Sequence, residues 1–194
     1  MRHEERSRTW IAALNRRAAL VLLAMQLFVC CAAAVALADG MNETHAETPA
    51  CETRGIRVEG NSMSPRIHDG NEIKVRLNAP VCAEPMRRGM VLLLSTNSHR
   101  LPLIKALRGL PSDTFAVKNG QIVINGHVAK NSEGVAYQLS GPRAAMIDLY
   151  VQEFHGRIPP DMYLVMGEDP HGTIDSSRFG LIERAQILGK VVER

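Results

Sequence analysis

The sequence predicts a mostly β, antiparallel domain that follows a single N-terminal transmembrane helix. Apolar and polar residues alternate with a period of two along Glu72–Leu77, as in a half-buried strand. Two Asn-Gly pairs, at 119–120 and 125–126, flank four residues rich in β-branched side chains and predict hairpin turns. An uncharged run of 21 residues, Ala18–Ala38, is long enough as a helix to cross a hydrocarbon core of ~30 Å.

The N-terminal charges give this helix its orientation. Residues 1–17 carry five arginines against two glutamates, which places them in the cytoplasm and exports the remainder of the chain. The alternative is a cleaved secretory signal, since Ala36-Leu37-Ala38 fits the small-x-small cleavage rule. The apolar run exceeds the usual signal core of roughly 7–15 residues, so we favour a retained anchor over 18–38. Residues 39–53 are polar and predict a linker.

Residues 54–194 contain the predicted folded domain. Continuous apolar runs indicate strands that are covered on both faces, and alternating runs indicate strands covered on one face. A weaker pattern over 142–154 is compatible with one short helix. The expected strands are Arg54–Glu59, Glu72–Leu77, Met90–Leu94, Leu101–Leu107, a meander over Phe115–Ala129, Met162–Met166 and Ala185–Val192.

Cysteine usage and charge limit the possible partners. Cys51 and Cys82 lie in the exported part, where disulfides persist. We expect a bridge between them, with two unpaired thiols as the alternative. The seven histidines are dispersed and no Cys/His spacing resembles a zinc site, so no metal and no cofactor are expected. A net charge of +3 without a basic patch makes nucleic acid an unfavoured partner.

Ser62 and Lys105 are the candidate reacting groups. Ser62 lies at the mouth of a predicted turn, and Lys105 interrupts an apolar strand in which it shares a face with Leu103 and Leu107. Only roughly one lysine in 2500 is neutral at pH 7, and burial raises that fraction by disfavouring the ammonium. The alternatives are a lysine on an exposed strand edge and an ordinary turn serine, with Ser64 a competing nucleophile.

Ser62 and Lys105 lie in two of three motifs that together resemble those of a known family. Ser62–Pro65, followed by Asp69-Gly70, resembles the Ser-Met-x-Pro nucleophile motif of the type I signal peptidases. Leu103–Asp113 resembles the motif that carries their lysine, and Val165–Gly180 resembles their last conserved motif. The three motifs stand in the family's order and spacing. The resemblance covers nearly all of residues 54–194 and implies the family's antiparallel β fold.

The resemblance implies a role for each matching position. Ser62 is the nucleophile and Lys105 the general base. Thr173 matches the serine that orients the lysine amine, and Asp175 and Arg178 match an ion pair that braces the site.

The resemblance also implies how substrate and oxyanion are bound. Gly60 stands where some members carry a serine that completes the oxyanion hole, so this site has one side-chain donor fewer. Substrate is expected to bind as an extended strand with small side chains before the scissile bond. The alternative for the matching apolar residues is ordinary core packing. These subsite residues are Ile56, Val58, Ile67, Leu103 and Ile104.

The chain departs from the family pattern at several positions. Its last motif reads Asp-Ser-Ser-Arg, which displaces Arg178 by one residue, and a one-residue slip reverses the side of a strand. Glu168 replaces an aspartate and Ser112 replaces a glycine. Two further departures are Asn71 and Met90.

The sequence therefore predicts a membrane-anchored serine endopeptidase that removes signal or leader peptides from exported preproteins. We place it in a bacterial inner membrane, in contact with lipid, with its catalytic domain on the periplasmic side. One alternative is a TraF-like peptidase that matures a pilin precursor for conjugation, and another is an inactive periplasmic assembly protein of the same fold. Self-cleaving repressors also use a Ser-Lys pair, but the exporting segment at 18–38 argues against a cytoplasmic repressor.

Overall fold

The computed structural model describes residues 51–78, 84–96 and 99–193. The described residues all belong to one compact unit, 49–194. The predicted cytoplasmic segment, the anchor at 18–38 and most of the linker lie outside the described residues, as does Cys82. Within the described ranges, no helix is both long and apolar enough to cross a bilayer.

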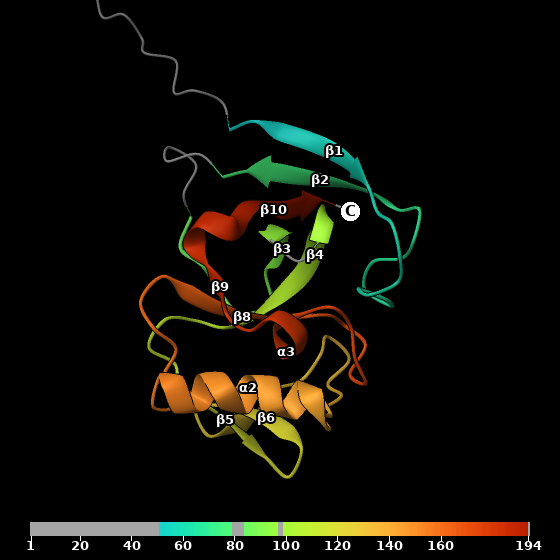
Figure 1. Ribbon diagram of the computed structural model, residues 1–194. Coiled ribbons are helices and arrows are strands. Elements are labelled where there is room, and N and C mark those ends of the chain that lie inside the picture. The colour runs from blue at the N-terminus through green and yellow to red at the C-terminus, as the bar shows by residue number, and fades with distance from the viewer. Residues whose placement is uncertain (1–50, 79–83, 97–98, 194) are drawn as a thin grey trace, which may run out of the picture. The chain divides into compact units, whose positions relative to one another are not determined.

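A seven-stranded antiparallel sheet forms the larger part of the described unit (Figure 1). Its neighbouring strands come from distant parts of the sequence, so the C-terminal strand lies between two early ones. In spatial order the strands are β1 (Thr53–Arg57), β2 (Glu72–Leu77), β10 (Ile187–Glu193), β3 (Val91–Thr96), β4 (His99–Gly109), β8 (Met162–Met166) and β9 (Ile182–Glu183).

The apolar patterns of these strands explain their burial. In β2, Ile73 and Val75 are buried and the polar residues between them are exposed, which confirms the predicted alternation. The first four residues of β3, Val91 to Leu94, are all buried, as expected for a strand covered on both faces. The last strand begins at Ile187 rather than Ala185, because a 3₁₀ turn (Arg184–Gln186) precedes it.

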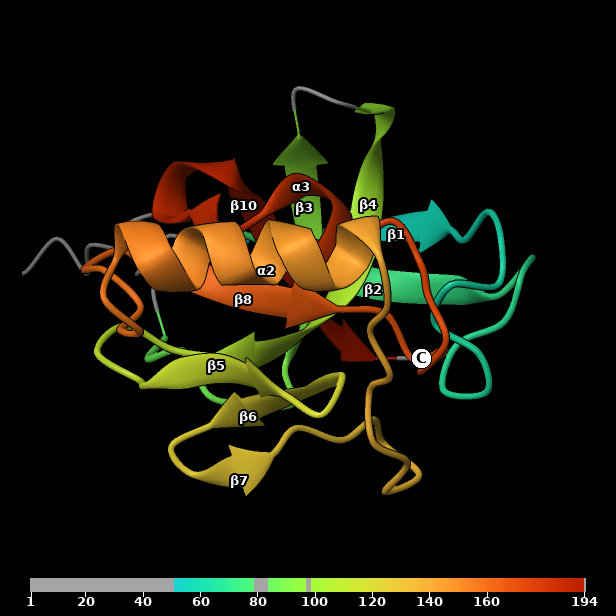
Figure 2. The same cartoon turned by 60° about the horizontal axis from the view of Figure 1, so that its bottom comes forward.

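A three-stranded sheet forms the smaller part, in the order β5 (Phe115–Lys118), β6 (Gln121–Ile124) and β7 (His127–Val128) (Figure 2). Both Asn-Gly turns have positive φ at each residue, with Asn119 at 51° and Gly120 at 74°. The predicted meander is therefore confirmed, with the turn chemistry that the sequence indicated.

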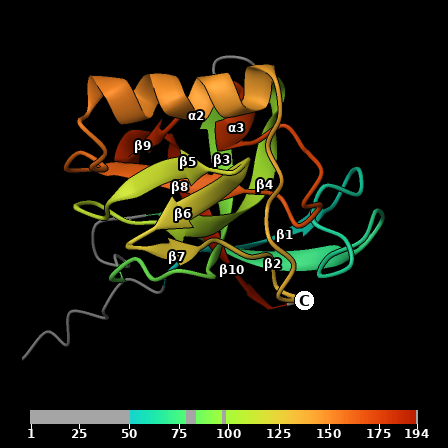
Figure 3. The same ribbon diagram turned by 90° about the horizontal axis from the view of Figure 1, so that it is seen from below.

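Helix α2 (Pro142–Glu153) confirms the weak helical pattern. It runs beside the small sheet, and the short helix α3 (Ser176–Phe179) packs against it (Figure 3). Ile147 of α2, Phe115 and Ile122 of the small sheet, and Leu164 of β8 share one apolar core. This core joins the smaller sheet to the larger one.

Candidate active site

Ser62 and Lys105, 43 positions apart, meet in the structure. Lys105 lies in β4, and Ser62 lies on the connection between β1 and β2. The lysine Nζ donates to Ser62 Oγ at 2.7 Å and to the Ile104 carbonyl at 2.8 Å. The connection is closed locally by the Ile67 amide, which donates to the Met63 carbonyl at 2.8 Å. A serine hydroxyl with an amine as its direct partner is the arrangement that nucleophilic catalysis requires.

Burial changes the acidity of this amine. Lys105 is only 1% exposed, and its burial lowers its pKa from 10.5 to about 8, although the nearby charge of Asp175 opposes that shift. With a pKa of about 8, roughly one lysine in ten is neutral at pH 7. Lys105 can therefore accept a proton near neutral pH, which an exposed lysine does rarely.

The backbone around Ser62 determines which amides can bind an oxyanion. Gly60 has a φ of 85°, and its N–H donates to Asp69 Oδ1 at 2.7 Å, so this amide is already occupied. Among the described residues, no acceptor meets the N–H of Ser62. The Ser62 amide is thus available for a negative oxygen on a bound carbonyl, whereas Gly60 contributes to the shape of the turn.

Asp175 organises the last motif behind the reacting pair. It is fully buried and caps the N-terminus of α3, where its Oδ1 accepts from the Ser177 amide and hydroxyl at 3.0 and 2.6 Å. Its Oδ2 accepts from the Thr173 hydroxyl at 2.6 Å and from the Gly167 amide at 3.1 Å. A Cβ added at Gly167 would lie 2.2 Å from Thr173 Oγ1 and 2.7 Å from the Ser62 carbonyl. Glycine is therefore needed where these segments approach.

Two of the predicted supports are arranged differently from the expectation. The Thr173 hydroxyl donates to Asp175, whereas the hydrogen bonds of the Lys105 amine go to Ser62 and Ile104 within the described part of the chain. Arg178 is exposed, and it forms no ion pair with Asp175. The extra serine before Arg178 turns the side chain by about 100° around the helix, away from the aspartate.

Arg143 of α2 contacts Asp175 through Ser177 instead. Its Nε donates to Ser177 Oγ at 2.8 Å, and that hydroxyl donates to Asp175. Its Nη1 donates to the Gln138 and His171 carbonyls. No sequence pattern pointed to Arg143, because an arginine in the first turn of a short helix is usually exposed to solvent.

A cavity of about 400 Å³ borders the hydrogen-bonded pair of Ser62 and Lys105. Ser62 and Lys105 both line it, together with four of the five predicted subsite residues, Ile56, Val58, Leu103 and Ile104. The prediction for Ile67 is wrong. Ile67 is 1% exposed and packs with Met63 and Ile73 in the core, because the turn after Ser62 directs its side chain inward.

The remaining sequence predictions concern cysteines and metals. Cys51 is disulfide-bonded; since Cys82 lies outside the described residues, the Cys51–Cys82 pairing stays a prediction. In the parts of the chain that the structure describes, no group of three or more His, Cys, Asp or Glu side chains is arranged to hold a metal ion.

Comparison with known proteins agrees with this geometry. The family model described as signal peptidase, peptidase S26, matches residues 18–194. The chain belongs to this family. It is 35% identical over 136 residues to a signal peptidase I of Bacillus amyloliquefaciens, an alignment that covers 68% of this chain and 70% of that protein. The signal peptidase I of Bacillus caldolyticus is 31% identical over 140 residues, covering 69% and 74%.

A solved signal peptidase I from Enterococcus faecalis V583 is 20% identical, has a TM-score of 0.38, and covers 56% of this chain and 98% of its own. With the family established, this S26 peptidase is a serine endopeptidase, and its mostly antiparallel β fold is the fold that the resemblance implied.

Proposed function

We propose that this peptidase removes signal peptides from exported preproteins with Ser62 as nucleophile and Lys105 as general base. The observation that carries the proposal is the 2.7 Å hydrogen bond between the buried amine and the serine hydroxyl beside an apolar cavity. The family membership and the signal peptidases I among its relatives support the substrate class. The intact pair argues against the alternative of an inactive assembly protein.

The proposed mechanism begins with neutral Lys105. As Ser62 Oγ attacks the scissile carbonyl, its proton moves to Lys105 Nζ, which then gives that proton to the leaving amine as the C–N bond breaks. The product is an ester between Ser62 and the signal peptide. Lys105 next takes a proton from water, the resulting hydroxide releases the peptide, and the proton returns to Ser62.

The Ser62 N–H, which meets no acceptor in the described part of the chain, is the proposed oxyanion donor. It belongs to the nucleophile itself, so it lies next to any carbonyl that Ser62 attacks. A donor of this kind typically contributes ~3 kcal/mol to stabilisation of the transition state. Gly60 offers no side-chain hydroxyl, so the second donor is a backbone group or a water molecule.

An unpaired edge of β4 fits an extended substrate. β4 pairs with β8 only from Ala106 onward, so within the described residues the preceding part of β4 has no strand on that side. A peptide added there would gain main-chain hydrogen bonds and place alternate side chains in the cavity. Because Ile56, Val58, Leu103 and Ile104 line that cavity, we expect short apolar side chains before the scissile bond.

The location of the enzyme is part of the same proposal. A helix over 18–38, with the basic residues before it in the cytoplasm, would tether the catalytic unit to the outer surface of the inner membrane, in contact with lipid. Signal peptides enter that membrane as apolar segments whose cleavage sites emerge on the same side. Tethering would therefore raise the local concentration of enzyme around its substrate.

The test is cleavage of a preprotein peptide with an Ala-x-Ala site by the full chain in liposomes. Ser62→Ala and Lys105→Ala should each abolish cleavage, whereas Ser64→Ala should retain it. Ser64 is the matched control because its hydroxyl contacts Asn61 and His68 on the same loop. Full cleavage by Ser62→Ala, together with loss in Ser64→Ala, would reassign the nucleophile. A pilin precursor assayed in parallel distinguishes a general signal peptidase from a dedicated pilin-maturing enzyme.

A further inference from the structure

We propose that Glu168 is a positioning residue for the nucleophile, because its buried carboxylate joins the Ser62 segment to the strand that carries Lys105. The inference rests on the peptidase activity proposed above. Glu168 directly follows Gly167 in the last motif, and its side chain does not contact the reacting atoms. It acts through two arginines and through its own main chain.

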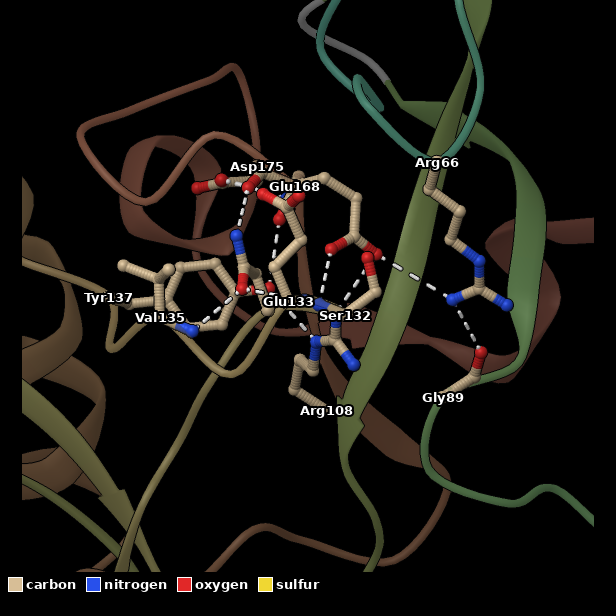
Figure 4. Close-up of polar contacts among 11 residues, drawn as sticks. Arg66, Gly89, Arg108, Ser132, Glu133, Val135, Tyr137, Glu168 and Asp175 are labelled. Carbon is tan, nitrogen blue, oxygen red and sulfur yellow. Dashed lines mark hydrogen bonds and ion pairs between the residues drawn. The ribbon is translucent and has the colours of Figure 1, made fainter.

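The Glu168 carboxylate is fully buried, with 0% exposure, and both its oxygens have partners (Figure 4). Its Oε1 accepts from Arg108 Nη2 at 2.9 Å and lies 3.6 Å from Arg66 Nη1. Its Oε2 accepts from the Ser132 amide at 2.7 Å. One carboxylate thus compensates two largely buried guanidinium groups, and a buried charge without such compensation is strongly unfavourable.

The two arginines come from the segments that must meet for catalysis. Arg66 lies four residues after Ser62 on the nucleophile connection, and Arg108 lies three residues after Lys105 on β4. The Glu168 amide also donates to the Ser62 carbonyl at 2.9 Å. A single residue therefore holds the nucleophile directly and links the two segments through charge.

The position of Glu168 is itself fixed from the opposite side. Asn131 Nδ2 donates to the Glu168 carbonyl at 2.9 Å, and the Tyr137 hydroxyl donates to the Gly167 carbonyl at 2.9 Å. That hydroxyl also accepts from Arg108 Nε at 2.9 Å. Burial raises the pKa of Tyr137 to about 12, so its phenol keeps the proton that it donates. Hydrogen bonds from both sides thereby hold the main chain at 167–168 against Ser62.

The pH dependence of kcat distinguishes a positioning role of Glu168 from an electrostatic effect of its charge on Lys105. The charge that perturbs Lys105 is that of Asp175, and the shift otherwise comes from burial. Removal of the Glu168 charge should therefore leave the pH midpoint of kcat in place. It should instead lower kcat at every pH, because the hydroxyl and the amine are no longer held at reacting distance.

The decisive variant is Glu168→Gln in the full chain, which keeps the size and the main-chain contacts and removes the charge. We expect kcat to fall about 100-fold, as for misplacement of reacting groups by about 1 Å. KM should stay within about threefold of the parent value, since the cavity residues are unchanged. An unchanged kcat, or a loss confined to KM, would overturn the inference.

Asp113→Asn is the matched control. Asp113 is 8% exposed, and its carboxylate pairs with Arg88 and accepts from the Leu110 amide in the turn before β5. We expect this variant to lower Tm while it retains kcat. An equal loss of kcat in Asp113→Asn would show that any buried carboxylate has this effect, and would refute a specific role for Glu168.

A double-variant cycle tests the ion pair itself. Arg108→Gln combined with Glu168→Gln should be no more defective than Glu168→Gln alone, because groups in one network are not additive. Independent, additive losses would contradict the proposed link. If Glu168→Gln does not fold, Arg66→Gln replaces it, because Arg66 is the more exposed of the two arginines that pair with Glu168. We expect Arg66→Gln to lower kcat, and Arg66→Lys, which keeps the positive charge, to retain more activity than Arg66→Gln.

Hydrogen exchange read by mass spectrometry needs no substrate. In Glu168→Gln, exchange should accelerate at residues 62–67, whereas Asp113→Asn should not change it there. Unchanged exchange at 62–67 in Glu168→Gln would refute the inference even if the peptide assay fails. Failure of the parent enzyme to cleave the peptide would count against the proposed function and not against this inference.

Discussion

The two sheets of this molecule contribute unequally to the candidate active site. The seven-stranded sheet carries Lys105 in β4 and Ser62 on the connection between β1 and β2, and its strand order brings β10 between β2 and β3. The three-stranded sheet is built from consecutive strands joined by two-residue turns, and it holds neither Ser62 nor Lys105. The proposed chemistry lies in the part with distant pairings, and the part with local pairings packs behind it.

The support is specific even though the smaller part touches no reacting atom. Asn131 and Tyr137 follow the meander and hold the main chain at 167–168, and Arg143 of α2 reaches Asp175 through Ser177. The cavity side of Lys105 is apolar, whereas the side behind Ser62 is charged and hydrogen-bonded. A base needs the first environment to lose its proton and the second to stay in place.

The largest effect is expected for Lys105→Met, which should separate activity from stability. We expect kcat to fall by at least about 10⁴-fold, as for loss of a base that acts together with its nucleophile. The free energy of unfolding at pH 7 should rise by up to about 3 kcal/mol, since the variant no longer buries an ammonium. Peptide hydrolysis and urea unfolding measure the two quantities.

The pH dependence checks the sign of this stability change. Below pH 8 the lysine is charged in the folded and unfolded parent chains, and the folded state carries the full cost of burial. Between pH 8 and 10.5 the unfolded chain binds more protons, so the parent gains stability as pH rises. Lys105→Met should lack that gain. A variant less stable than the parent at pH 7 would contradict the burial argument.

The next largest effect is expected for Asp175→Asn. The charge of Asp175 raises the pKa of Lys105, so its removal should move the acid limb of kcat below pH 8. The same change disturbs four hydrogen bonds to Gly167, Thr173 and Ser177, and we expect kcat to fall about tenfold or more. A pH series of kcat measures both, with the exposed Asp169→Asn as control. A limb that stays at pH 8 would exclude Asp175 as the perturbing charge.

An effect on stability alone is expected for Gly120→Ala in the first turn of the meander. Gly120 has a φ of 74°, and an added Cβ would lie 3.0 Å from the Leu139 carbonyl. The left-handed conformation costs an alanine about 1–2 kcal/mol. Gly126→Ala has a similar φ of 80° but meets nothing within 4 Å, so it isolates the backbone term. Both variants should lower Tm and leave kcat unchanged; a fall in kcat would show that the two parts are more tightly coupled.

The success of the sequence predictions differs between local and long-range features of the fold. The Asn-Gly turns and the alternation in Glu72–Leu77 are local signals, and the structure confirms the meander and the strand that they predicted. The pairing of Ser62 with Lys105 was predicted because both residues lie in motifs whose order and spacing match the family. Periodicity alone favoured neither residue over an ordinary turn serine or edge lysine.

The wrong predictions for site residues concern side-chain direction. Ile67 is apolar, as expected of a subsite residue, but the turn after Ser62 directs its side chain into the core. Arg178 matches the motif, but one additional serine turns it toward solvent. The contacts of Arg143 and Glu168 join segments more than thirty residues apart, for example Arg143 with Ser177 and Arg108 with Glu168. No local pattern encodes such contacts.

The smallest effect is expected for Arg178→Ala, the residue that the motif singled out. Its side chain is exposed and does not pair with Asp175, so kcat and Tm should both stay close to the parent values. Arg143→Gln is the matched comparison, because it removes the cation that is linked to Asp175 through the Ser177 hydroxyl. It should lower kcat, and it should lower the free energy of unfolding by about 1–3 kcal/mol. Peptide hydrolysis and thermal unfolding of the two variants side by side decide the matter. If Arg178→Ala were the more damaging change, the support of Asp175 would come from its own helix and not from α2.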